Sequence, residues 1–177
     1  MNKENCCFVL VDFQDRLVSV MGDCSDQIKN INILNQASVI LNIPLIVTEQ
    51  YPKGLGKTSS QITLPDNYSL VEKTTFSCFD SDKFVAQLSK LSVDSVILFG
   101  LEAHICVLKT ALDGLKLNYK VYVVADAISS RTQENKLLAI ERMRQSGVFI
   151  VSTEMIIFQL LTDSMDPEFK AISALVK

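Results

Sequence analysis

The sequence contains only one histidine, His104, in 177 residues. A metal site that needs two histidines is therefore excluded, and no CxxC motif or Cys/His cluster offers another zinc site. Nucleotide-binding motifs are also missing. No GxGxxG follows the first apolar run, and Gly56-Lys57-Thr58 lacks the leading glycine of a phosphate loop, because Tyr51 occupies that position. We therefore expect neither a metal nor a cofactor.

Long apolar runs and a basic excess are absent as well. No run approaches the roughly 18 residues that a membrane-spanning helix needs, and the N-terminal apolar run is too short for a secretory signal because Asp12 interrupts it. The net charge is −3 and the lysines and arginines are scattered. We therefore expect no membrane partner and no nucleic-acid partner.

The five cysteines are Cys6, Cys7, Cys24, Cys78 and Cys106. An odd number without close, usefully spaced pairs argues against a disulfide framework and favours a reducing, cytoplasmic location. Hydrophobic residues make up 48% of the chain, which is enough for a sizeable core. The length predicts a single domain over residues 1–177.

Short apolar runs alternate with longer amphipathic segments along the chain. The runs typical of buried strands occupy 6–11, 45–48, 69–73, 95–99, 121–125 and 148–151, and the segments typical of helices occupy 25–42, 80–91, 105–117, 132–146, 153–161 and 167–176. This alternation predicts an α/β fold: a three-layer α/β/α arrangement with a six-stranded, mostly parallel sheet. We expect the Rossmann-like strand order 3-2-1-4-5-6 for this sheet. Residues 49–68 are rich in turn formers and predict a long, functional or lid-like loop.

Three chemically matched residues fall at the carboxyl ends of predicted strands, where open α/β sheets carry their sites. Asp12 ends the first strand, Lys73 ends the third, and Cys106 begins the helix after the fourth. A helix N-terminus and a nearby ammonium favour a cysteine thiolate, and a carboxylate can accept the thiol proton. The turn 100–105 offers backbone N–H groups for an oxyanion.

Each of these residues also has an ordinary structural interpretation. Cys106 alone is as often an inert buried side chain as a nucleophile. Asp12 is equally compatible with capping the next element, and a lysine such as Lys73 is usually solvated. His104 fits a turn or a pocket wall, and Asp126 fits a helix cap better than a second acid.

The chain resembles the isochorismatase-like cysteine hydrolase superfamily, and is most similar to the isochorismatase domain-containing proteins. Six segments carry the resemblance in order: Val9–Gln14, Thr48–Gly56, Glu72–Ser77, Gly100–Cys106, Val124–Arg131 and Arg142–Gly147. The resemblance implies a catalytic set of Asp12, Lys73 and Cys106. It also implies a cis peptide at Leu101–Glu102 and oxyanion donors at the backbone N–H groups of Glu102 and Cys106. Members are commonly homo-oligomers, so we expect a dimer or tetramer.

Two departures from the family pattern narrow the expected substrate. The histidines of the nicotinamidase metal site are missing, which disfavours nicotinamide. Glu102 stands where many relatives carry a small residue, and its carboxylate would disfavour anionic substrates if it entered the pocket.

The sequence thus predicts a metal-independent cysteine hydrolase acting on a small molecule at an amide-like C–N bond. The candidate pocket walls are Phe13, Gln14, Tyr51 and Phe76. Two alternatives stay open. The chain could be a catalytically inactive oligomeric scaffold or partner-binding protein that retains the fold, or a thiol redox sensor that pairs Cys106 with Cys78.

Overall fold

The computed structural model describes residues 1–177 and contains one six-stranded sheet. The strands are β1 (Cys6–Val11), β2 (Leu45–Gln50), β3 (Ser69–Lys73), β4 (Ser95–Leu101), β5 (Lys120–Ser129) and β6 (Phe149–Val151). Their order is β3-β2-β1-β4-β5-β6, and every neighbouring pair is parallel. The predicted α/β fold and strand order are confirmed. Short apolar runs linked by helical crossovers explain why all neighbouring strands are parallel.

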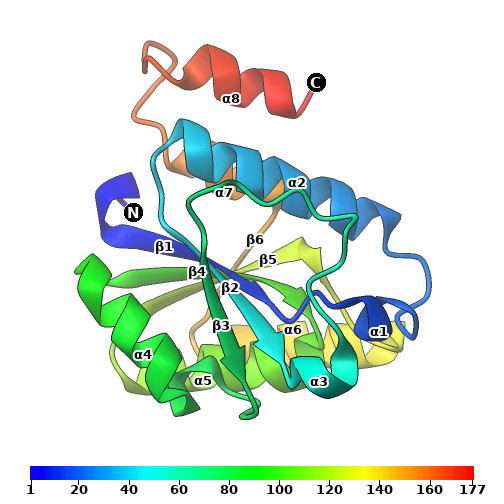
Figure 1. The fold of residues 1–177 in the computed structure, drawn as a ribbon. Coiled ribbons are helices and arrows are strands. Elements are labelled where there is room, and N and C mark those ends of the chain that lie inside the picture. Colours follow the sequence, from blue (N-terminus) through cyan, green and yellow to red (C-terminus); the bar gives the residue numbers. More distant parts are fainter.

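Helices cover both faces of the sheet, which completes the three layers (Figure 1). One face carries α2 (Ser25–Ile40), α7 (Thr153–Gln159) and α8 (Phe169–Leu175), and the other carries α4 (Asp82–Leu88), α5 (Leu108–Lys116) and α6 (Gln133–Gln145). Two short helices, α1 (Asp15–Val18) and α3 (Pro52–Leu55), lie near the carboxyl ends of β1 and β2. Single 3-10 turns occupy Lys3–Asn5, Cys78–Asp80 and Ser89–Leu91.

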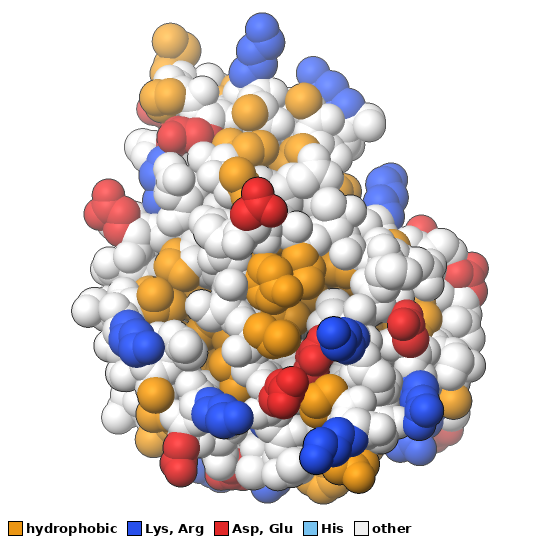
Figure 2. Space-filling model, viewed as in Figure 1, with side chains coloured by type: hydrophobic (Ala, Val, Ile, Leu, Met, Phe, Trp, Pro, Cys, Tyr) orange, Lys and Arg blue, Asp and Glu red, His pale blue; other side chains and the backbone are white.

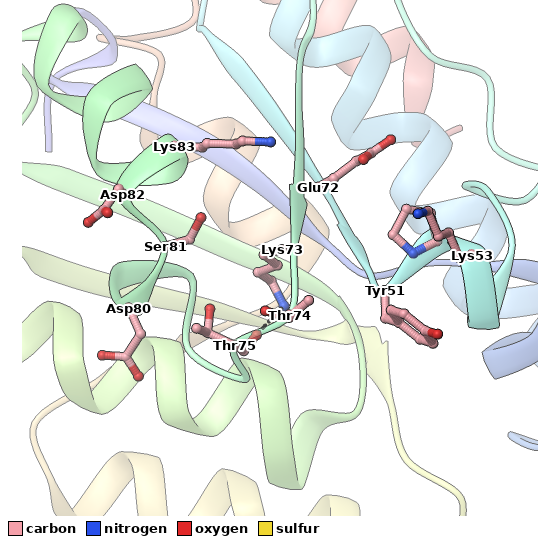
Figure 3. Close-up of a pocket in the computed structure, with 11 residues that line it drawn as sticks. Tyr51, Lys53, Glu72, Lys73, Thr74, Thr75, Asp80, Ser81, Asp82 and Lys83 are labelled. Carbon is pink, nitrogen blue, oxygen red and sulfur yellow. Dashed lines mark hydrogen bonds between the residues drawn. The ribbon is translucent and has the colours of Figure 1, made fainter.

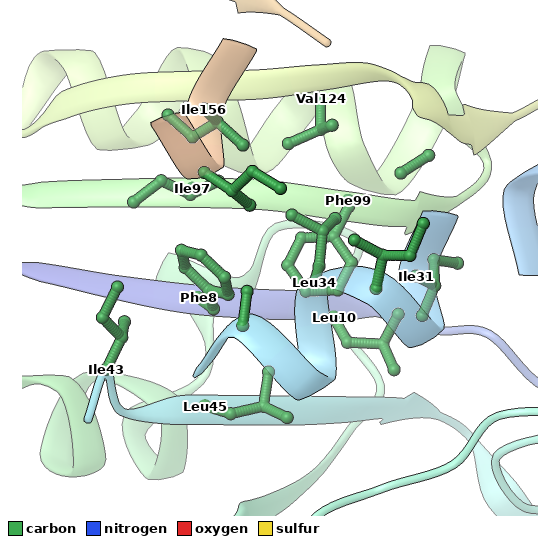
Figure 4. Packing of buried hydrophobic residues seen from close by; sticks show 14 of the residues in the cluster. Phe8, Leu10, Ile31, Leu34, Ile43, Leu45, Ile97, Phe99, Val124 and Ile156 are labelled. Atoms are coloured by element: carbon green, nitrogen blue, oxygen red, sulfur yellow. The ribbon is translucent and has the colours of Figure 1, made fainter. Parts of the chain in front are cut away.

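The core is divided in two by the sheet, with 26 buried residues on one side and 20 on the other. Strand β1 serves both halves: Phe8 and Leu10 point to the larger cluster, and Cys7 and Val9 to the smaller. Figure 4 shows Phe8 between α2 and the central strands, and its ring meets Phe99 edge-on at 5.9 Å. Burial on both faces explains why the central strands are continuous apolar runs.

The structure differs from the predicted elements mainly at the carboxyl edge. β2, β4 and β5 run further than their apolar cores, because parallel pairing continues through polar residues such as Gln50, which lies opposite Lys73. Part of the predicted loop 49–68 is therefore strand and part is α3. The predicted helix 105–117 begins instead with a π-helical turn, Ala103–Val107, that leads into α5.

The surface carries both signs of charge. On the face seen in Figure 2, acidic and basic side chains are interspersed over the molecule. None of the helices combines the length and the hydrophobicity needed to cross a lipid bilayer.

Candidate active site

The centre of the site is an ion pair between Asp12 and Lys73. Asp12 follows β1, and Lys73 is the last residue of β3, two strands away in the sheet. The Lys73 side chain reaches across β2, so that its Nζ lies 2.7 Å from Asp12 Oδ2 with both side chains fully buried. Asp12 has a φ of 50°, a left-handed backbone conformation that is uncommon outside glycine. Strain of this kind is often retained at functional sites.

Strand β2 lies between the two charges and contacts both of them. Thr48 Oγ1 donates to Asp12 Oδ1 at 2.7 Å, and Lys73 Nζ donates to Gln50 Oε1 at 2.8 Å. Lys73 Nζ also donates to the Thr75 carbonyl at 3.2 Å. Both carboxylate oxygens of Asp12 and all three ammonium hydrogens of Lys73 thus have partners, as a buried charged pair requires.

Cys106 lies on the π-helical turn beside this pair and is 3% exposed. Burial raises the pKa of the Cys106 thiol, and the Asp12 carboxylate raises the pKa further by repelling the thiolate and accepting a hydrogen bond from the thiol. The Lys73 ammonium opposes both effects and lowers this pKa. The resting sulfur is therefore a neutral thiol with a proton acceptor next to it.

Lys73 is the permanent cation of the site. Burial lowers the pKa of its ammonium, but the nearby acids Asp12, Cys78 and Cys106 raise the pKa by more, so that it stands above the ordinary lysine value. Lys73 therefore stays charged at neutral pH and can compensate negative charge on Asp12 or Cys106 in turn.

The turn from β4 to the π-helix is defined by two unusual backbone conformations. Gly100 has a φ of 131°, and a Cβ there would clash with the Val11 carbonyl oxygen of the neighbouring strand. Glu102 has a φ of 58°, and its backbone N–H donates to no acceptor within the chain. The structure contains no cis peptide bond, so the expectation of one at Leu101–Glu102 was wrong. The left-handed conformation at Glu102 turns the chain with trans peptides instead.

The Glu102 side chain holds together the two loops that flank Cys106. Its Oε1 lies 3.1 Å from Arg131 Nε, and its Oε2 lies 3.4 Å from His104 Nδ1. The same His104 nitrogen is 3.0 Å from Ser130 Oγ. The Glu102 side chain is only 9% exposed, and its Oε2 has no hydrogen-bond partner. His104 therefore belongs to this network, and Asp126 lies elsewhere, where its carboxylate accepts from the Thr153 backbone N–H at 2.8 Å.

The four predicted pocket walls have different surroundings. Phe13 and Gln14 are fully buried, and the Gln14 amide bonds to the Gln50 backbone at 3.1 Å and 2.7 Å, which attaches the following loop to β2. Phe76 is largely exposed. Tyr51 lines a polar cavity of about 520 Å³ next to Lys73.

This cavity lies between α3, the end of β3 and the start of α4 (Figure 3). Its wall carries hydroxyl groups and both signs of charge, including Lys53, Glu72, Thr75 and Lys83. In Figure 3 the Lys83 side chain extends towards β3. No group of three or more His, Cys, Asp or Glu side chains is arranged to hold a metal ion, and all five cysteines are free thiols.

Sequence reasoning placed the three site residues at one sheet edge but missed the contacts that join them. Thr48 and Gln50 were predicted as a strand end and part of a loop within a family segment, and Arg131 as part of another family segment, without a role for any of the three side chains. The sequence feature that could have identified Thr48 and Gln50 is their two-residue spacing, which puts both side chains on one face of a strand.

The chain belongs to the isochorismatase family: residues 6–155 match the family model described as "Isochorismatase domain". "Isochorismatase domain-containing protein 2" of Danio rerio is 38% identical over 176 residues, which is 99% of this chain and 89% of the relative. "Isochorismatase domain-containing protein 1" of the same organism is 37% identical over 97% of this chain, and the chain spans 59% of that relative's length.

Two further likenesses concern function and location. A solved structure described as "Structure of MAR1 Ribonuclease from Caenorhabditis elegans" is 36% identical and superposes with a TM-score of 0.93, covering 99% of this chain and 91% of that one. A "Secreted isochorismatase effector Isc1" of Phytophthora sojae is 42% identical over 82% of this chain and 72% of the relative.

Proposed function

We propose that residues 1–177 form one metal-independent cysteine hydrolase domain that cleaves an amide-like C–N bond of a small molecule through a thioester on Cys106. The observation that carries this proposal is the buried Asp12–Lys73 pair, 2.7 Å apart, next to a nearly buried thiol. A fixed proton acceptor and a permanent cation beside one sulfur are what nucleophilic catalysis by a neutral thiol needs.

The first half of the reaction forms the thioester. The carboxylate of Asp12 takes the proton of the Cys106 thiol, and the sulfur electron pair attacks the substrate carbonyl carbon. The carbonyl oxygen becomes an oxyanion, for which the unpaired N–H of Glu102 and the N–H of Cys106 are the proposed donors. When the oxyanion collapses, the C–N bond breaks, and the nitrogen leaves as an amine with the proton that Asp12 holds.

The second half restores the enzyme. Asp12 takes a proton from a water molecule, whose oxygen attacks the thioester carbon. The C–S bond then breaks, the carboxylic acid leaves, and the sulfur recovers a proton from Asp12. Lys73 stays protonated throughout and compensates the negative charge that moves between the carboxylate and the sulfur.

The test is turnover of a panel of small aliphatic and aromatic carboxamides, followed by ammonia or amine release. Cys106→Ala and Asp12→Asn should each lower kcat by at least about 100-fold. Cys24→Ala, which removes a buried thiol from the opposite side of the sheet, should keep wild-type activity. Mass spectrometry of the acid-quenched wild-type reaction should find an acyl group on Cys106. Full activity in the Cys106 or Asp12 variant would exclude the mechanism.

The same purified proteins also test two rival functions. A non-catalytic scaffold predicts that no carboxamide is hydrolysed and no acyl group appears on Cys106. A ribonuclease, as the Caenorhabditis elegans relative is named, predicts cleavage of single-stranded RNA. The interspersed charges of the face in Figure 2 and the net charge of −3 favour a small molecule over a polyanion.

We further propose that the chain forms a homo-oligomer and is located in the cytoplasm. Light scattering of the purified chain would determine the first. The second rests on five free cysteines, which suit a reducing compartment.

A further inference from the structure

Strand β2 carries two polar side chains, Thr48 and Gln50, that form hydrogen bonds with the two charged groups of the site. They are two residues apart, so they project from the same face of the strand. Thr48 is fully buried and donates to Asp12 Oδ1 at 2.7 Å, and it also accepts from the Asp12 backbone N–H at 3.3 Å. Gln50 accepts from Lys73 Nζ at 2.8 Å.

Each side chain is itself held in place, so its contact is directional. The Gln50 amide nitrogen donates to the Thr74 carbonyl at 2.8 Å, which leaves the Gln50 oxygen facing Lys73. The Gln50 backbone N–H donates to Gln14 Oε1 at 2.7 Å. The Thr48 hydroxyl has one hydrogen, and that hydrogen is used on Asp12.

This inference rests on the proposed function. We propose that Thr48 and Gln50 are positioning residues, each of which holds one member of the Asp12–Lys73 pair. Thr48 fixes the carboxylate against the Cys106 thiol, and Gln50 fixes the ammonium. Neither residue exchanges a proton in the proposed steps; Thr48 acts through Asp12, and Gln50 acts through Lys73. Without Thr48, one carboxylate oxygen loses its donor and Asp12 is free to turn away from the sulfur. Without Gln50, Lys73 loses one of its three acceptors and is free to shift away from the sulfur.

The two roles predict opposite effects on one measurable property, the rate at which iodoacetamide alkylates Cys106. The Asp12 charge opposes the thiolate and the Lys73 charge favours it. Thr48→Val should therefore move the alkylation rate upwards, towards the rate of Asp12→Asn. Gln50→Met should move the rate downwards, because the cation is less well held. A general loss of stability would move both variants in the same direction.

Thr110→Val is the matched control. Thr110 is also a fully buried threonine in this half of the molecule, but its hydroxyl accepts from the Cys78 backbone N–H at 3.0 Å and not from the ion pair. Thr110→Val should keep the wild-type alkylation rate. Thr48→Ser, which keeps the hydroxyl donor to Asp12, should return the rate to within about threefold of the wild type.

Turnover gives the second readout. With a carboxamide that the wild type hydrolyses, Thr48→Val and Gln50→Met should each lower kcat by about tenfold or more and leave KM within about threefold. Equal alkylation rates in Thr48→Val, Gln50→Met and Thr110→Val would overturn the positioning roles. If the wild type hydrolyses no carboxamide, the proposed function fails, whereas the alkylation rates still decide between positioning and mere packing.

Discussion

Lys73 Nζ lies 2.7 Å from Asp12 Oδ2, and neither side chain is exposed to solvent. The two residues come from strands that are not neighbours, and each supplies the countercharge that permits the other to be buried. The pair therefore contributes to folding as well as to the chemistry proposed above.

Lys73→Met should destabilise the protein strongly, because it leaves the Asp12 carboxylate buried without a countercharge. The expected loss is about 3–5 kcal/mol in the free energy of unfolding, measured by urea denaturation near neutral pH. The double variant Asp12→Asn with Lys73→Met should lose less than Lys73→Met alone, since no buried charge remains. An additive double variant would show that the two side chains are energetically independent.

Asp12→Asn should separate the reactivity of the thiol from catalysis. The Asp12 carboxylate raises the pKa of the Cys106 thiol, second only to burial, while Lys73 lowers this pKa. A neutral asparagine removes the repulsion and leaves Lys73 in place, so the thiol pKa falls. Alkylation of Cys106 by iodoacetamide should become faster at a pH of about 8.5, whereas turnover should fall. Slower alkylation in this variant would contradict the assigned geometry.

Stability should decrease as the pH rises above about 9. Burial raises the pKa of Cys6 to about 12 and of Cys78 to about 11, and it also raises the pKa of Cys7. The unfolded thiols lose their protons near pH 8.5 while the folded ones keep theirs, so the unfolded state binds fewer protons and the free energy of unfolding falls with pH. The raised pKa of Lys73 acts in the same direction at higher pH, because the unfolded lysine loses its proton first.

This pH dependence can be measured as the urea midpoint at several pH values between neutral and about 10.5. Cys7→Ala should show a shallower decrease than the wild type, since one buried thiol no longer contributes. A slope that is unchanged in this variant would mean that Cys7 does not titrate differently in the two states.

Gly100→Ala should be poorly tolerated. The added Cβ would clash with the Val11 carbonyl oxygen, and the φ of 131° is itself unfavourable for any residue with a side chain. We expect a loss of several kcal/mol in the free energy of unfolding, on the order of the largest single-substitution effects. Gly147→Ala is the matched control, because its φ of 97° is also positive but no atom lies within 4 Å of the added Cβ. Equal losses in the two variants would assign the cost at Gly100 to its backbone conformation alone.

Much of the fold could be predicted because local patterns and chain connectivity constrain it. The run Cys6–Val11 is apolar on both faces, which is typical of a strand buried between two helical layers, and it is β1 in the structure. The segments at the carboxyl edge were less predictable, since polar residues such as Gln50 gain their strand conformation from a neighbouring strand. The π-helical turn at Ala103–Val107 has no distinctive composition, so the sequence predicted an ordinary helix there.

The amino-acid sequence by itself determined the alternation of strands and helices and placed Asp12, Lys73 and Cys106 at the carboxyl ends of strands, because apolar runs linked by helical crossovers imply a parallel sheet whose strand ends share one edge. Only the tertiary structure decided how these residues meet. Whether Lys73 crosses β2 to reach Asp12, and which residues hold both charges, depends on contacts between strands far apart in the chain. Such contacts follow from packing and from the need to pair every buried charge, which no local pattern encodes.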